Sequence, residues 1–218
     1  PKRYDNCLIN KKNNTLEIQN NYRDSNPEIC VIDSFLTEEA LEDIQKYCRN
    51  ANIFKHPYEF GYVGAFLSEG MSSKFFLKLS EDMRKTFPEI FQNYKLTQAW
   101  IFKYDNKKIG TKVHADQASI NVNFWIAPND ANLNPDSGGL VIWDKITPKN
   151  SNFNDYNSLK ASKEMEQFLS DSGIKEIKIP HRENRCVIFN SKLFHRTDDF
   201  NFKKSYANRR VNVTLLFD

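Results

Sequence analysis

Two histidines and one aspartate are spaced along the sequence so that they could bind a single metal ion. A single alanine separates His114 from Asp116, and His195 lies far downstream, after an apolar run. On a strand, residues i and i+2 project from the same face, so the first imidazole and the carboxylate could reach one ion. Two histidines and a carboxylate on one face of iron(II) leave positions open for substrate and oxygen, whereas a structural zinc site takes four protein ligands. The pattern therefore predicts an iron centre suited to oxidation.

The His-x-Asp pair is weak on its own, because such pairs arise by chance and a lone histidine is more often a surface or core residue. The two remaining histidines are poorer candidates for the third ligand. His56 precedes Pro57 in an expected loop, and His181 follows Pro180 at the opposite end of an expected strand from His195. Whether the His-x-Asp pair belongs to a metal site therefore depends on the residues further along the chain.

A buried arginine is expected at the start of the last apolar run, residues 210–217. By strand alternation Arg210, Asn212 and Thr214 share one face, while Arg209 points to the other. Burying a guanidinium in an apolar sheet is costly unless it meets an anion, and its fork suits a carboxylate. Two interpretations stay open: a bound carboxylate helped by the threonine hydroxyl, or a salt bridge to an aspartate on a neighbouring strand.

The elements that must position these residues change in type along the chain. Residues 38–49, preceded by Thr37 as a cap, and about 72–86, ended by Pro88, have apolar residues at helical spacing. Beyond them, short runs rich in β-branched and aromatic residues predict strands at 97–104, 111–118, 119–127, 139–143, 174–179, 185–190 and 210–217. Helices followed by many short strands predict a mainly β fold, with a sandwich or jelly-roll core and flanking helices.

Two further segments could border a site. In the run 119–127, Asn121 and Asn123 alternate with apolar residues, so they either face solvent or line the pocket and bind a ligand there. The polar stretch 144–160 is long for a loop in a compact domain, and we expect it to act as a lid. A helical insertion follows this stretch and should end at Gly173.

Length and composition limit the number of domains and the classes of partner that we expect. We expect an irregular polar lead-in over residues 1–30 and a single domain over 31–218, with helices up to about residue 95 and the β core after it. The net charge is +3 with both signs interspersed, so no nucleic-acid partner is expected. The absence of a long apolar stretch, a secretory signal or paired cysteines predicts a cytoplasmic protein without a membrane partner. The first residue is Pro1 rather than Met, as in a fragment or a processed chain.

The ordered set of motifs resembles the iron(II)- and 2-oxoglutarate-dependent oxygenases, in particular their prolyl-4-hydroxylase-like branch. The order is His-x-Asp, a later histidine, and then Arg-x-x-x-Thr on the final strand. Supporting matches are Tyr104 upstream of the first ligand, the Gly-Gly turn of residues 137–140 and the segment 31–37. The resemblance covers roughly residues 31–218.

The resemblance implies a double-stranded β-helix (jelly-roll) core and a complete site. His114, Asp116 and His195 would bind Fe(II), and the co-substrate 2-oxoglutarate and O2 would take the open positions. Arg210 would pair with the distal carboxylate of 2-oxoglutarate, and the other residues expected to bind this co-substrate are Tyr104, Thr214 and Asn123.

Two departures from the family pattern affect these assignments. The interval from His195 to Arg210 is longer than is usual in that branch, so Arg209 stays open as the alternative partner of the co-substrate. The stretch 144–173 has no counterpart in the family pattern.

The resemblance also implies a reaction, in which a substrate is hydroxylated and succinate and CO2 are released. We expect a protein or peptide side chain as the substrate, by analogy with the prolyl hydroxylases. A small molecule, such as an amino acid or a natural-product precursor, is the alternative. The third possibility, a non-catalytic jelly-roll binding module, is disfavoured because a vestigial site need not keep all three ligands and Arg210.

Overall fold

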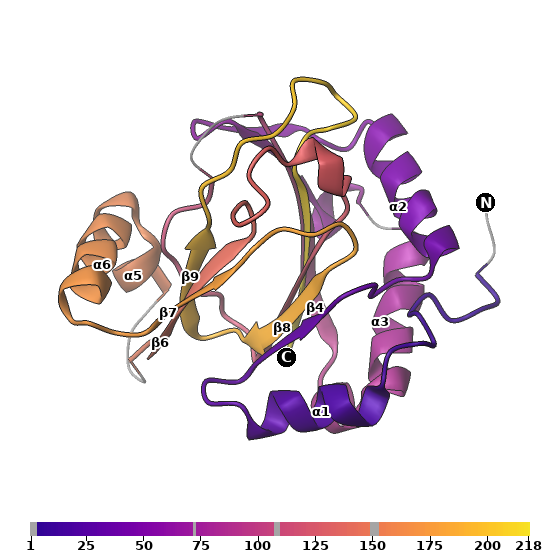
Figure 1. Cartoon of the computed structure of the whole chain (residues 1–218), viewed down its shortest axis with the longest axis horizontal. Helices are drawn as coiled ribbons and strands as arrows, with labels where there is room; N and C mark the ends of the chain where they lie inside the picture. The colour runs from indigo at the N-terminus through magenta and orange to yellow at the C-terminus, as the bar shows by residue number, and fades with distance from the viewer. Residues whose placement is uncertain (1–3, 72, 107–109, 149–152) are drawn as a thin grey trace.

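The computed structural model describes residues 4–71, 73–106, 110–148 and 153–218. Two antiparallel sheets face each other at its centre (Figure 1). The larger sheet has the strand order β1-β8-β5-β10-β4-β3-β2 and the smaller one β7-β6-β9. The strands are β1 Ile29–Ile32, β2 His56–Tyr58, β3 Tyr62–Phe66, β4 Leu96–Tyr104, β5 Ile120–Trp125, β6 Leu140–Ile146, β7 Glu176–Ile179, β8 Cys186–Asn190, β9 Leu193–Thr197 and β10 Val211–Phe217.

Helices cover the outer face of each sheet (Figure 1). The first group packs on the larger sheet and the last two helices lie beside the smaller one. The α-helices are α1 Thr15–Asp24, α2 Glu38–Asn50, α3 Lys74–Thr86, α4 Pro88–Phe91, α5 Phe153–Asn157 and α6 Leu159–Asp171, with 3-10 turns at η1 Leu67–Glu69 and η2 Asn129–Ala131. The predicted mainly β fold with flanking helices is confirmed.

The helix signals of the sequence correspond to α2 and α3. Thr37 caps α2 by accepting a hydrogen bond from the amide of Ala40 at 3.2 Å, and α2 buries Ile44 and Cys48. Helix α3 ends just before Pro88, as predicted; residue 72, where we expected it to begin, lies outside the described residues. Both helices bury their apolar stripe against the larger sheet, which is the usual role of an amphipathic helix.

The N-terminal lead-in contains a helix, so the prediction of irregular structure there is wrong. Asn14 caps α1 by accepting from the amide of Glu17 at 3.3 Å. Leu8 and its neighbour Ile9 are buried in the main core, and the amide of Leu8 donates to the buried carboxylate of Asp82 at 2.8 Å. The lead-in has too few apolar residues to show a helical or strand periodicity in the sequence. Tertiary contacts with α3 order it instead.

Most strand predictions are confirmed, but the segment 111–118 is not a strand. Only His114 forms a bridge there, pairing with His195, and Asp116 lies in irregular chain. His195 itself lies within β9, a separate strand that follows β8, rather than at the end of the β8 run. The hydrophobic alternation of Val113 and Ala115 reflects packing against β9 and α6, without a full ladder of backbone hydrogen bonds.

The predicted lid, residues 144–160, is not one long loop. Strand β6 continues to Ile146, and helix α5 and the start of α6 occupy the far end of the stretch. Residues 149–152 lie outside the described residues. In the described ranges, none of the helices combines the length and apolar character needed to cross a lipid bilayer.

Candidate metal centre

Three ligand-type side chains converge between the two sheets. One nitrogen each from His114 and His195 and one carboxylate oxygen of Asp116 all lie within 4.8 Å of one another. The Nε2 atom of His195 is 3.5 Å from Oδ2 of Asp116, and the two imidazole rings have centroids 4.3 Å apart. Within the described parts of the chain, the structure therefore brings together the trio that the sequence predicts.

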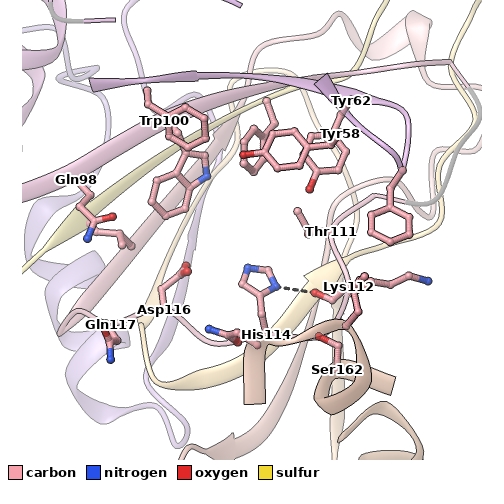
Figure 2. A pocket seen from close by; sticks show the side chains of 16 residues that line it. Tyr58, Tyr62, Gln98, Trp100, Thr111, Lys112, His114, Asp116, Gln117 and Ser162 are labelled. Atoms are coloured by element: carbon pink, nitrogen blue, oxygen red, sulfur yellow. Dashed lines mark hydrogen bonds between the residues drawn. The ribbon is translucent and has the colours of Figure 1, made fainter. Parts of the chain in front are cut away.

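Both imidazoles are oriented by their own backbone surroundings. Nδ1 of His114 lies 2.6 Å from the carbonyl oxygen of Lys112 (Figure 2), and Nδ1 of His195 lies 2.9 Å from that of Leu193. A carbonyl only accepts, so Nδ1 must carry the proton in each ring, and Nε2 keeps its lone pair. Burial, and then the proximity of His195, lower the pKa of His114 to about 4. This ring is therefore neutral at neutral pH, as a metal ligand must be.

The carboxylate of Asp116 is held in its ionised form. Burial alone would raise its pKa, but the proximity of His195 and His114 and a hydrogen bond from Asn121 together lower it below the ordinary value. The amide Nδ2 of Asn121 donates to Oδ2 at 2.7 Å. The site therefore offers two imidazoles, each with Nε2 directed away from its backbone carbonyl partner, and one carboxylate.

A chain of buried polar side chains continues from Asp116 into the larger sheet. Asn121 accepts a hydrogen bond from Asn123, and Oδ1 of Asn123 accepts from Asn212 at 2.6 Å and from Thr214 at 2.9 Å. The register explains this contact, because Asn123 lies opposite Thr214 on the paired strands β5 and β10. All four side chains are buried, so the interpretation that the asparagines face solvent is wrong.

Arg210 is fully buried and has one unsatisfied donor. Its Nε and Nη2 donate to the carbonyl oxygens of Gly138 and Gly139 at 2.6 and 2.9 Å. Its guanidinium lies 4.5 Å from the ring centroid of Tyr104. Nη1 has no hydrogen-bond partner within the described residues, although a buried donor normally has one. Burial lowers the pKa of Arg210, while Tyr104 and Asp198 act in the opposite direction.

The backbone at Gly138 and Gly139, whose carbonyl oxygens bind Arg210, requires glycine at both positions. Gly138 has φ +85°, a conformation that favours glycine. A Cβ atom on Gly139 would lie 1.9 Å from the carbonyl oxygen of Ile179. The Gly-Gly turn therefore presents two carbonyl oxygens to Arg210 at a place where no side chain fits.

Arg209 lies in a different environment from Arg210. Its guanidinium pairs with the carboxylate of Asp105, and its side chain is 35% exposed. The salt bridge considered for the buried arginine is thus formed by its neighbour. Among the described residues, Arg210 has no ion pair with a carboxylate, which leaves its free donor available to an anionic ligand.

The sequence did not predict a cluster of hydroxyl groups beside Tyr104. The Tyr104 hydroxyl lies 3.3 Å from Oγ1 of Thr197, which is 2.7 Å from Oγ1 of Thr111. A Cβ on Gly110 would lie 2.5 Å from the Thr197 side chain, so this approach needs glycine. Glycine is scarce in the chain, and Gly110 was the one available signal.

The other two histidines lie outside the trio. His56 pairs with the carboxylate of Glu69 at the surface. His181 is buried against Trp125 and Phe202, and neither of its ring nitrogens has a hydrogen-bond partner in the described ranges. Burial, and then the charges of Arg210 and Arg185, lower the pKa of His181 to about 3.

Helices α5 and α6 hold the segment that carries the first two ligand candidates. The side-chain amide of Asn157 donates to the carbonyl of Ala115 at 2.8 Å and accepts from the amide of Ala115 at 3.1 Å. The hydroxyl of Ser162 donates to the carbonyl of Val113 at 2.6 Å. These bonds replace a strand partner for the residues on either side of His114.

Two adjoining hollows meet at the trio. A cavity of about 610 Å³ opens on the side of His114 and Asp116 (Figure 2), and a smaller inner pocket is lined by the whole trio and by Arg210. Both are bordered by Trp100, Phe102, Thr111, His114 and Asp116. The three remaining residues predicted to bind the co-substrate, Tyr104, Thr214 and Asn123, also line the inner pocket.

Solved structures share this architecture. The carbocyclase SnoK from nogalamycin biosynthesis, described as non-heme and alpha-ketoglutarate dependent, matches with a TM-score of 0.65 and 10% identity over 94% of this chain and 84% of its own. A Pseudomonas putida prolyl-4-hydroxylase matches with a TM-score of 0.58 and 12% identity over 93% and 97% of the two chains. HygX from Streptomyces hygroscopicus, solved with nickel and 2-oxoglutarate, gives 0.59 and 12% over 96% and 87%.

The fold is that of the 2-oxoglutarate-dependent oxygenases. The predicted double-stranded β-helix is thereby confirmed. No protein-family model matches the sequence, and no curated protein matches it significantly. In this oxygenase fold the trio lies between the two sheets, and the inner pocket extends from it toward Arg210.

Proposed function

We propose that the protein is an Fe(II)- and 2-oxoglutarate-dependent dioxygenase that hydroxylates its substrate and releases succinate and CO2. One observation carries the proposal: the His114, Asp116 and His195 trio shares a pocket with the buried Arg210, whose Nη1 lacks a partner among the described residues. A metal trio alone would fit many activities. An unpaired buried guanidinium beside it calls for an anion.

The donor set fits iron(II). Two imidazoles with free Nε2 atoms and one ionised carboxylate are the ligands of non-haem iron(II) oxygenases, and three protein ligands leave positions open. His114, Asp116 and His195 would therefore hold the metal. Asn121 fixes the rotation of the carboxylate by its hydrogen bond to Oδ2.

The polar side chains that line the inner pocket match the chemistry of the co-substrate. Arg210 offers Nη1 to the distal carboxylate of 2-oxoglutarate, and Tyr104 holds the guanidinium in place with its ring. Thr214 and Asn123 line the same pocket and would contribute polar contacts. When bound, iron and 2-oxoglutarate supply the oxidation chemistry, in which O2 is reduced as the co-substrate loses CO2.

The protein's own contribution is to orient these groups and to exclude water from them. The side chains of Trp100, Phe102 and Leu140 line the inner pocket and keep it largely apolar around the polar contacts. Exclusion of water strengthens the attraction between Arg210 and a bound carboxylate, because charges interact more strongly at low dielectric constant. The buried chain from Asn121 to Thr214 fixes the polar groups before any ligand arrives.

Two substrate classes follow from different observations. The order of the sequence motifs, which resembles the prolyl-4-hydroxylase-like branch, favours a protein or peptide side chain. The volume and aromatic lining of the 610 Å³ cavity favour a small molecule instead, since pockets for such ligands have volumes of roughly 300–1,000 Å³. A non-catalytic binding module is the least favoured alternative, because the trio and Arg210 are all present.

An anaerobic titration with Fe(II) and 2-oxoglutarate tests the proposal. Chelation of the metal by the co-substrate gives a weak visible charge-transfer band, which we expect for the wild-type protein. His114→Ala should abolish the band and His56→Ala should leave it unchanged, because His56 pairs with Glu69 outside the site. A wild-type protein without the band would show that the site is wrongly assigned.

A further inference from the structure

An aromatic wall faces the candidate metal centre across the 610 Å³ cavity. Its rings come from β2, β3 and β4. Tyr58 and Tyr62 stack with ring centroids 4.5 Å apart and an interplanar angle of 13°, and Phe102 lies 4.9 Å from Tyr62. Trp100 extends the wall at 6.2 Å from Phe102. Figure 2 shows Tyr58, Tyr62 and Trp100 on one side of the cavity, with the ligand candidates on the other.

Much of the polar lining on the opposite side is already engaged within the protein. The side-chain amide of Asn157 is bonded through both its oxygen and its nitrogen to Ala115, and Ser162 donates to Val113. Thr111 is bonded to Thr197. A peptide would bring an N–H and a carbonyl for every residue, and each of these must find a partner when it leaves water. Among the described residues, the side-chain amides of Gln98 and Gln117 are the amides left in this lining for such contacts, which is few for a peptide.

Lys112 is the one lysine or arginine among the described residues that line the cavity. Its ammonium lies 5.4 Å from the centroid of the Phe60 ring, at the side of the cavity away from the trio's carboxylate. The sole carboxylate in that lining is Asp116, which we assign to the metal. The charge of this lining therefore favours a ligand with an acidic group.

We infer that the cavity binds a flat, conjugated small molecule that carries one acidic group. Such a molecule would lay its face or edge against Tyr58, Tyr62 and Trp100, since aromatic rings favour stacked and edge contacts. Its acidic group would meet Lys112. This inference rests on the proposed function, because it takes the molecule in the cavity to be the substrate.

Calorimetric titration of the purified full chain, before metal or 2-oxoglutarate is added, tests the inference. Four probes separate its parts: anthracene-2-carboxylate, the neutral alcohol 2-(hydroxymethyl)anthracene, the fully saturated analogue of the acid, and a short uncharged proline-containing peptide. We expect the flat acid to bind about ten-fold or more tightly than each of the other three, because only it satisfies both the rings and the lysine.

Two variants assign the contacts. Tyr58→Leu should remove most of the preference for the flat over the saturated acid, and this side chain is half-exposed, so the fold should tolerate the change. Lys112→Gln should bring the acid and the alcohol to within about two-fold of each other. Phe168→Leu on α6 and Lys46→Gln on α2, both exposed and outside the cavity, are the matched controls and should change neither preference.

Each outcome of the titration decides the inference. Tighter binding of the flat acid, lost in the two cavity variants only, supports it. Equal binding of flat and saturated acids, tighter binding of the peptide, or no binding of any probe overturns it. The charge-transfer band is measured separately, so a protein that shows the band but ignores the flat acid keeps the proposed function and loses only the substrate class.

Discussion

His114 and His195 exchange backbone hydrogen bonds in both directions: the amide of each donates to the carbonyl of the other, at 3.0 and 2.8 Å. This bridge lies outside the regular ladder of the smaller sheet and holds the backbones of the two histidines side by side without a metal. A preformed site should bind a divalent metal without a large rearrangement of the chain.

Metal binding should therefore raise the thermal stability of the wild-type protein. A metal at about one hundred times its Kd adds about 2.7 kcal/mol, which corresponds to about 5–10 °C in Tm for a chain of this size. His195→Ala should lose this shift and His56→Ala should keep it. Scanning calorimetry with and without Mn²⁺ measures the difference. An unchanged shift in His195→Ala would remove this residue from the ligand set.

Arg210→Lys should weaken 2-oxoglutarate binding while the charge is kept. Lysine cannot reach both carbonyls of the Gly-Gly turn and also present a fixed donor to the pocket. We expect the Kd for 2-oxoglutarate to rise about 10–100-fold, or about 1.4–2.7 kcal/mol. Arg209→Lys is the matched control and should change the Kd by less than about two-fold, because this residue pairs with Asp105. Equal effects of the two substitutions would contradict the assignment.

Asn121→Ala should reduce metal affinity although Asn121 does not belong to the trio. The substitution removes the donor that orients the Asp116 carboxylate, and loss of such a partner costs about 10–100-fold in metal affinity. Competition with a chromophoric chelator measures the metal Kd. Asn190→Ala on β8, whose side chain bonds Glu28 instead, should leave it unchanged. The idea fails if both variants bind metal like the wild type.

His181 should make the metal-free protein sensitive to acid. Its folded-state pKa of about 3 lies below the ordinary value of 6.5, so the unfolded chain takes up the proton more readily. The stabilising contribution is complete above pH 6.5 and falls as the pH decreases toward 3, by at most about 1.4 kcal/mol per pH unit. Urea unfolding at pH 7 and pH 5 should show a smaller decrease for His181→Phe than for the wild type. An equal decrease in both proteins would assign the acid sensitivity to other groups.

Gly139→Ala should be far more destabilising than Gly173→Ala. A Cβ at position 139 would lie 1.9 Å from the carbonyl oxygen of Ile179, and neither backbone can yield easily. We expect a loss of about 3 kcal/mol or more, as for severe overpacking. Gly173 has φ +63° and open space around it, so alanine there should cost about 1–2 kcal/mol. Midpoints of chemical unfolding compare the two, and similar midpoints would contradict the steric argument.

The parts of the candidate site that depend on local spacing could be predicted from the sequence. The pair His114 and Asp116, the later His195 and the alternation after Arg210 are all visible in a single chain, and the structure brings these residues together. It also separates Arg209 from Arg210, which the sequence left open, because only burial distinguishes two adjacent arginines.

Other features of the site and the fold could not be predicted, because they depend on contacts between residues that are far apart in the chain. Thr111 meets Thr197, 86 positions away, and no local pattern marks either residue. The segment 111–118 imitates a strand because its alternate residues pack inward, yet it lacks the neighbour that a ladder requires. Leu8 and Ile9 are ordered by α3 and the Leu36 backbone, which are contacts that propensity does not report.

Asn157 ties the helical insertion to the segment that carries two of the ligand candidates. Its side-chain amide supplies both the donor and the acceptor that a neighbouring strand would otherwise offer to Ala115, the residue between two ligand candidates. The insertion therefore adds hydrogen bonds on both sides of His114 to those that His195 and Ser191 already make with this segment. A chimera in which another sequence replaces α5 and α6 should therefore need a new donor and acceptor for the backbone of Ala115.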